Sequence, residues 1–224
     1  MATMVDIREF CKFVQSDVPK APVDTVKAAI IDALRDFCQK TYLWTRTSEW
    51  TDILAGQSTY GFSMPANTDM CGIMYVEYRP DVTLTPQEIK ATTVDALNAT
   101  RSNWRNDTGL APSQFISKEP GVIQLIPYPA ATEADQPDAL RVEIAVFPSV
   151  TAVQAPEFML NSWGLIIGAG AKVRLMTMPK QPWSGDPSYF LKIYNDGITA
   201  CRSRVNKSAT SRSMSVKIPL TGRR

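Results

Sequence analysis

The sequence contains no histidine among its 224 residues. This absence removes the commonest general base of enzymes, and with it the Ser-His and Cys-His pairs that activate nucleophiles. The cysteines are widely separated and form no Cys-x-x-Cys pair, so they encode neither a zinc site nor a thioredoxin-like redox motif. Three of them, Cys11, Cys38 and Cys201, fall on apolar helical stripes and are interpreted as small core residues. We therefore expect no catalytic residue, no metal and no cofactor, and the sequence favours a role other than catalysis.

Long apolar runs are missing as well. The longest, Trp163 to Val173, is far shorter than the roughly 20 residues that a membrane-spanning helix needs. The first residues place Asp6, Arg8 and Glu9 where a secretory signal would be apolar. We expect a soluble chain that is made in the cytoplasm and has no membrane partner.

Negative charge is absent from the C-terminal end. Residues 201–224 hold 7 Lys and Arg and no Asp or Glu, whereas residues 1–200 hold 17 Lys and Arg against 22 Asp and Glu. Such a block of like charges repels itself and rarely packs alone, which points to an acidic or phosphate-bearing partner. Nucleic-acid binding is an alternative, although seven basic residues on an otherwise acidic chain are few for a dedicated DNA reader.

Alternation of apolar and polar residues returns near the end of this basic segment. Val216, Ile218 and Leu220 are separated by single residues, as in a strand that could add to an exposed sheet edge. We expect an arm that becomes ordered on a partner, with a solubilising tail as the alternative. The predicted partner-binding residues are Arg212, Met214, Val216, Lys217, Ile218, Leu220, Arg223 and Arg224.

Helical periodicity marks both ends of the chain, where apolar residues recur at steps of three and four. The periodic segments are Asp6 to Ser16, Val23 to Tyr42, Glu157 to Thr177 and Asp186 to Val205. The third is apolar on nearly every side and is predicted to be buried. Its glycines superficially resemble a nucleotide-binding loop, but they lie inside a helix and Lys172 follows Ala171 rather than a glycine. We interpret Gly164 and Gly168 as positions where a neighbouring helix comes close.

Between these helices the pattern is typical of β-structure, with up to about six short strands separated by Gly and Pro turns. They include Cys71 to Arg79, Gln114 to Ser117, Val122 to Pro127 and Leu140 to Phe147, while Pro86 to Asn98 is predicted as one or two short helices. The predicted fold class is α+β: the N- and C-terminal helices form one bundle, an antiparallel β region is inserted, and a C-terminal arm extends. The predicted ranges are 1–44 and 151–207 for the bundle, 45–150 for the β region and 208–224 for the arm.

Several short aromatic and turn motifs follow one another in a distinctive order. They are Phe37 to Trp44, Trp50, Ile53 to Pro65, Met70 to Tyr78, Gly109 to Phe115, Ile123 to Pro129, the Ala- and Gly-rich helix, and Pro182-Trp183. Over roughly residues 23 to 205, this order resembles the adaptor proteins of tailed bacteriophages, also called head-to-tail connectors.

The resemblance implies a structural virion protein rather than an enzyme. Such adaptors form a ring, commonly of about twelve subunits, in the neck of the virion. One face of the ring docks on the portal protein and the other meets the tail tube or nozzle, while DNA passes through the lumen without sequence recognition. In similar proteins a C-terminal extension clasps the portal, so the resemblance assigns the arm of this chain the same partner.

Overall fold

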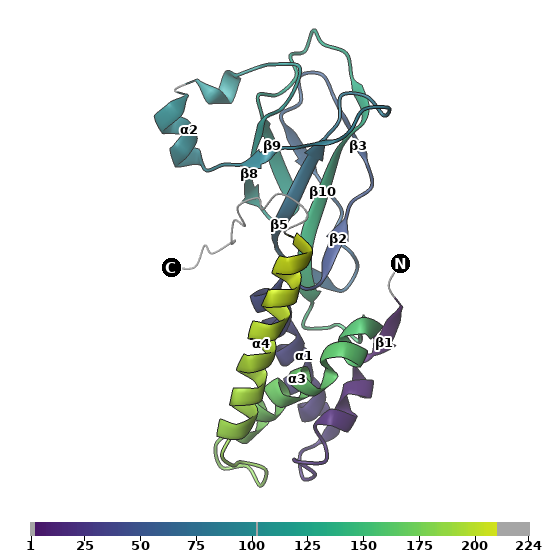
Figure 1. Cartoon of the computed structure of the whole chain (residues 1–224), viewed down its shortest axis with the longest axis vertical. Helices are drawn as coiled ribbons and strands as arrows, with labels where there is room; N and C mark the ends of the chain where they lie inside the picture. The colour runs from purple at the N-terminus through teal and green to yellow at the C-terminus, as the bar shows by residue number, and fades with distance from the viewer. Residues whose placement is uncertain (1–2, 102, 210–224) are drawn as a thin grey trace. The chain divides into compact units, whose positions relative to one another are not determined.

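The computed structural model describes residues 3–101 and 103–209. Within them the chain divides into two compact units (Figure 1). Residues 3–44, 66–69 and 146–209 form the first, which we call the helical unit, and residues 45–65 and 70–145 form the second, which we call the β unit.

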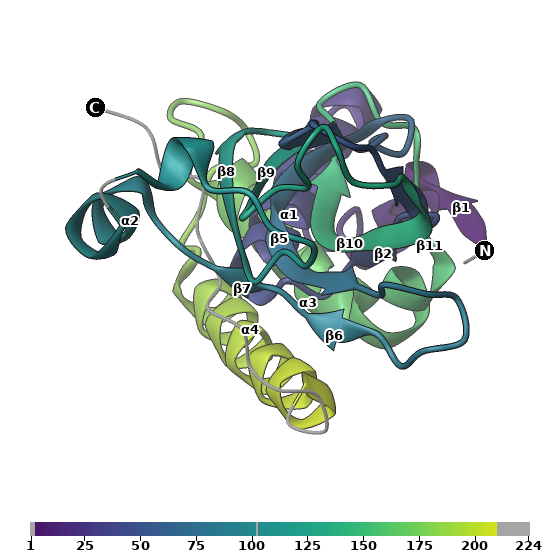
Figure 2. The ribbon, with the colours of Figure 1, turned by 90° about the horizontal axis from the view of Figure 1, so that it is seen from above.

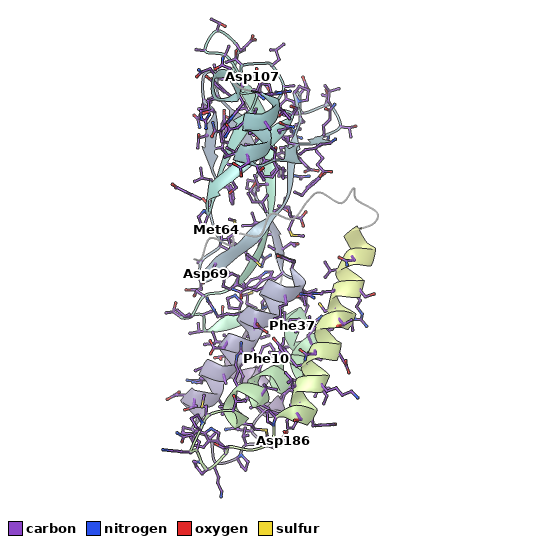
Figure 3. All side chains as sticks on the ribbon, turned by 90° about the vertical axis from the view of Figure 1, so that its left-hand side faces the viewer. Phe10, Phe37, Met64, Asp69, Asp107 and Asp186 are labelled. Atoms are coloured by element: carbon purple, nitrogen blue, oxygen red, sulfur yellow. The ribbon has the colours of Figure 1, made fainter. Side chains whose placement is uncertain are left out.

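Three α-helices dominate the helical unit: α1 (Val23–Thr41), α3 (Glu157–Met176) and α4 (Ser188–Ala209). A 3-10 helix, η1 (Ile7–Phe13), packs against both α1 and α3. The helix α1 forms where apolar residues recur at helical spacing, and it ends at Tyr42, whose left-handed backbone (φ 53°) lets its N–H donate to the Cys38 carbonyl. Phe10 of η1 and Phe37 of α1 are fully buried inside this unit (Figure 3).

The helical unit also contains a small sheet. Strand β1 (Met4–Asp6) pairs antiparallel with β11 (Gln154–Pro156), with Val5 opposite Ala155. The Glu157 N–H extends this ladder by donating a hydrogen bond to the Thr3 carbonyl at 2.8 Å. The start of the chain is therefore tied to the residues that immediately precede α3.

The β unit is built mainly from two sheets. The five-stranded sheet has the order β2 (Thr45–Thr47), β10 (Gln136–Pro148), β5 (Thr68–Tyr78) and β6 (Gln87–Glu88), with β3 (Thr51–Ile53) also pairing with β10. The four-stranded sheet has the order β4 (Thr59–Gly61), β9 (Val122–Ile126), β8 (Gln114–Glu119) and β7 (Lys90–Ala91).

A small helical lobe follows β7 along the chain. It consists of α2 (Val94–Thr100) and the 3-10 helix η2 (Trp104–Asn106), and Figure 1 shows α2 beside β8. The Thr93 hydroxyl caps α2 by accepting a hydrogen bond from the Ala96 N–H. Trp104 is buried with Leu97, Ile116 and Ile126, which attaches the lobe to β8 and β9.

The predicted fold class, a bundle with one inserted antiparallel β region and an extended arm, is wrong. The described strands form three sheets, one of them curled into a half-barrel, within a mixed α+β fold. One sheet, β1 with β11, belongs to the helical unit, and β7 pairs with β8 in parallel rather than antiparallel. These pairings join very short segments, whose two or three residues carry too little alternation to predict a partner.

Local predictions are refined or corrected by the structure. The short amphipathic helix predicted over Asp6 to Ser16 is a 3-10 helix over Ile7–Phe13. The segment Pro86 to Asn98 contributes β6 and β7 before any helix begins. At the other end, the helix predicted over Asp186 to Val205 is α4, which continues to Ala209.

Candidate interaction surfaces

The predicted partner-binding residues all lie outside the part of the chain that the structure describes. They are Arg212, Met214, Val216, Lys217, Ile218, Leu220, Arg223 and Arg224. Candidate surfaces within the described residues must therefore be built from other side chains.

Large apolar side chains are exposed on the helical unit. On the first half of α3, Phe158 and Leu165 lie two turns apart on one face, and Leu165 is 72% exposed. On α4 the first turn exposes Tyr189 (69%) and Leu191, and the segment around β11 exposes Val153. Because Phe158 and Leu165 share one face of α3, that face is a candidate protein contact surface.

The glycines of α3 explain how this unit is held together. A Cβ atom at Gly168 would lie 2.7 Å from the Phe13 Cβ, and one at Gly170 would lie 2.6 Å from the Tyr194 ring. On α4, a Cβ at Gly197 would meet Ile166 of α3 at 2.4 Å. A Cβ at Gly164 would meet the Phe13 ring at 2.5 Å, so the interpretation of Gly164 and Gly168 as sites of close approach is confirmed. The packing of α3 against η1 and α4 is therefore sensitive to single methyl groups.

A polar link joins α4 to α1. The Tyr194 hydroxyl donates to the Asp36 carboxylate at 2.8 Å, and that carboxylate also pairs with Lys40 at 2.8 Å. Burial and the nearby Asp36 carboxylate both raise the pKa of Tyr194, so the phenol stays protonated and remains a donor. Further along α4, the Arg202 guanidinium donates to the Lys40 carbonyl at the end of α1.

The five-stranded sheet carries a charged network. The Glu77 side chain is only 12% exposed, with one carboxylate oxygen accepting from Arg141 and the other from the Tyr75 hydroxyl. Two guanidinium groups lie close to the Trp50 ring, Arg79 at 3.9 Å and Arg141 at 4.4 Å from its centre. The Glu77 carboxylate is therefore held within this network rather than surrounded by solvent. Because both of its oxygens accept hydrogen bonds, we assign it a structural role.

A groove opens at the edge of the β unit. It has a volume of about 440 Å³ and is lined by Tyr78 and by residues 87–90 and 111–114. It forms where the chain passes from β6, the edge strand of one sheet, to β7, the edge strand of the other. Figure 2 shows β7 lying between β6 and β8. The Ile89 N–H bonds back to Val76 of β5, whereas the Lys90 N–H bonds to Ser113 ahead of β8. The two walls therefore separate at this point.

Leu110 stands beside this groove on a fixed backbone. Its carbonyl accepts hydrogen bonds from the Gln136 amide at 3.0 Å and from the Tyr78 hydroxyl at 3.3 Å. The Leu110 side chain is nevertheless 63% exposed. The groove could not be predicted from the sequence, because residues 87–90 and 111–114 in its walls lie more than 20 residues apart.

The cysteines predicted to be core residues are buried. Cys11 is 8% exposed and Cys38 and Cys201 are fully buried, and burial raises the pKa of the Cys11 and Cys201 thiols. Raised thiol pKa values disfavour the reactive thiolate. Across residues 3–101 and 103–209, no group of three or more Cys, Asp or Glu side chains is arranged to hold a metal ion.

Comparison with known proteins leaves the family open. No protein-family model matches the chain, and no curated protein matches its sequence. None of the described helices combines the length and the apolar character needed to cross a membrane.

Proposed function

We propose that this chain is a head-to-tail adaptor of a tailed bacteriophage, a structural subunit and not an enzyme. Its copies form a ring, commonly of about twelve, in the virion neck after synthesis in the host cytoplasm. The ring docks on the portal protein and offers its other face to the tail tube or nozzle. DNA passes through the lumen, and the C-terminal residues supply a second attachment to the portal, whose linkage to the first raises avidity.

The observation that best supports this proposal is the exposure of apolar side chains on closely packed helices. The exposed side chains are Phe158 and Leu165 on α3 and Tyr189 and Leu191 on α4. Glycines at the contact between α3 and α4 let these two helices pack closely. A subunit that acts by contact needs such preorganised apolar side chains, because they lose little conformational entropy on binding. The order of motifs over residues 23 to 205 gives the second support, through its resemblance to adaptor proteins.

The test is the mass of the purified chain, alone and after mixing with portal rings, by light scattering on a sizing column. We expect a complex with about one copy of this chain per portal subunit. A failure to bind portal rings of the cognate phage would contradict the proposal. If DNA binding that weakens steeply with salt were found instead, a nucleic-acid-binding module would replace it.

A further inference from the structure

We propose that strand β1 (Met4–Asp6) pairs with β1 of a second copy of this chain, which joins the small sheets of the two helical units into one larger sheet. The contact is antiparallel and two-fold, so each copy offers the same edge to the other. The inference does not rest on the adaptor function, because a ring is built from a contact that repeats head to tail.

The outer edge of β1 has unpaired main-chain groups. The Ile7 N–H donates to the Val153 carbonyl at 3.0 Å, and hydrogen-bonded pairs alternate along an antiparallel ladder, so Val5 bonds to β11 in the same way. Met4 and Asp6 are the alternate residues, and their main-chain groups point away from β11. Neither N–H donates a hydrogen bond within residues 3–101 and 103–209. Both residues are exposed, so solvent reaches this edge.

The two edges of this small sheet differ in what they can recruit. On the far edge of β11, Pro156 has no N–H, which protects that edge from pairing. Strand β1 contains neither a proline nor a lysine, the residues that commonly protect an edge. Figures 1 and 2 both show β1 at the outer margin of the helical unit. The edge that is open to a partner is therefore that of β1.

The order of donors and acceptors on this edge selects a second copy as the partner. With Met4 opposite Asp6 of the partner subunit, each outward N–H meets an outward carbonyl. Val5 then lies opposite Val5 of the partner subunit at a non-hydrogen-bonded position, where cross-strand side chains come closest. No two carboxylates face each other in this register. Because every copy carries the edge, a second copy always offers the complementary strand.

The first test is the association of the full-length chain without portal, measured by sedimentation velocity. Met4→Pro removes an outward N–H and leaves the bonds between β1 and β11 intact, since proline is tolerated where the N–H faces solvent. Met4→Ala is the matched control, because it shortens the same side chain and keeps the N–H. We expect the native chain and Met4→Ala to dimerise over the same concentration range, and Met4→Pro to dimerise at least tenfold more weakly. A native chain that stays monomeric up to about 1 mM, or equal association of the two variants, would overturn the proposal.

A disulfide tests the register independently. Val5→Cys places two thiols opposite each other across the two-fold axis, with Cα atoms about 4.5 Å apart, which is within the range of a disulfide. Met4→Cys is the control, because its thiol lies opposite Asp6 of the partner subunit. Under mild oxidation we expect a covalent dimer with Val5→Cys, and with Met4→Cys no more than the native chain forms through its own cysteines. If Met4→Cys cross-linked as readily as Val5→Cys, or neither exceeded the native chain, the proposed pairing would be wrong.

Discussion

At the scale of single residues, the ion pair between Lys172 of α3 and Asp17 shows how a partly buried cation is satisfied. The Lys172 side chain is 11% exposed and its ammonium group lies 4.5 Å from the centre of the Phe190 ring. The hydrogen bond and positive charge of Lys172 lower the pKa of the Asp17 carboxyl. The pair therefore stabilises the folded chain only while Asp17 is ionised.

We expect the stabilising effect of Asp17 to depend on pH. Because its pKa is lower in the folded chain than in the unfolded chain, the effect is full above about pH 5 and disappears as pH falls through the folded pKa. Asp17→Asn should cost about 0.5 kcal/mol at pH 7, a small value because the Asp17 side chain is 41% exposed, and less than that near pH 2. Urea unfolding at both pH values measures this difference. Asp196→Asn, on an exposed part of α4, is the control, and a loss that is equal at both pH values would contradict the explanation.

At the scale of elements, helix packing depends on positions where a side chain is absent. In most helix interiors, replacing a glycine such as Gly168 with alanine stabilises the helix by about 1 kcal/mol. Here an added Cβ would lie 2.7 Å from the Phe13 Cβ and 3.1 Å from the Phe13 carbonyl oxygen, so main-chain atoms of η1 would have to move. The steric cost opposes the gain in helix propensity.

We expect Gly168→Ala to lower the free energy of unfolding by about 1 to 3 kcal/mol, the usual cost of overpacking a core. Chemical denaturation followed by circular dichroism measures the change. Gly185→Ala is the control, since nothing lies within 4 Å of its added Cβ. A Gly168→Ala variant that is more stable than the native chain would show that η1 yields easily and that the glycine is not required for packing.

Elements with a long periodic pattern could be predicted from the sequence, and elements held by distant partners could not. The segment Val23 to Tyr42 was predicted to be helical and forms α1 over Val23–Thr41, because its apolar stripe recurs through five turns. The helix predicted from Pro86 begins only at Val94, because Gln87 pairs with β5 and Lys90 pairs with β8 as edge strands of the two sheets. The groove between those edges is equally invisible to local patterns. Tertiary pairing overrides local propensity at such positions.

At the scale of the whole molecule, the exposed apolar residues of the helical unit gain a role only if copies of the chain meet. Leu165 is 72% exposed in the middle of α3, so it contributes little to the stability of an isolated copy. In a ring of subunits the same side chain would be covered by a neighbour. Leu165→Glu therefore separates folding from assembly.

We expect Leu165→Glu to leave the thermal unfolding midpoint within about 2 °C of the native value and to weaken association at least tenfold, because burying an unpaired carboxylate in a contact is costly. Light scattering on a sizing column, with and without portal rings, measures the number of copies that assemble. Thr199→Glu places the same charge on an exposed position of α4 and serves as the control. If Leu165→Glu and the native chain formed assemblies of the same mass at the same concentration, the exposed face of α3 would not be a subunit contact, and a ring would have to be built from other surfaces.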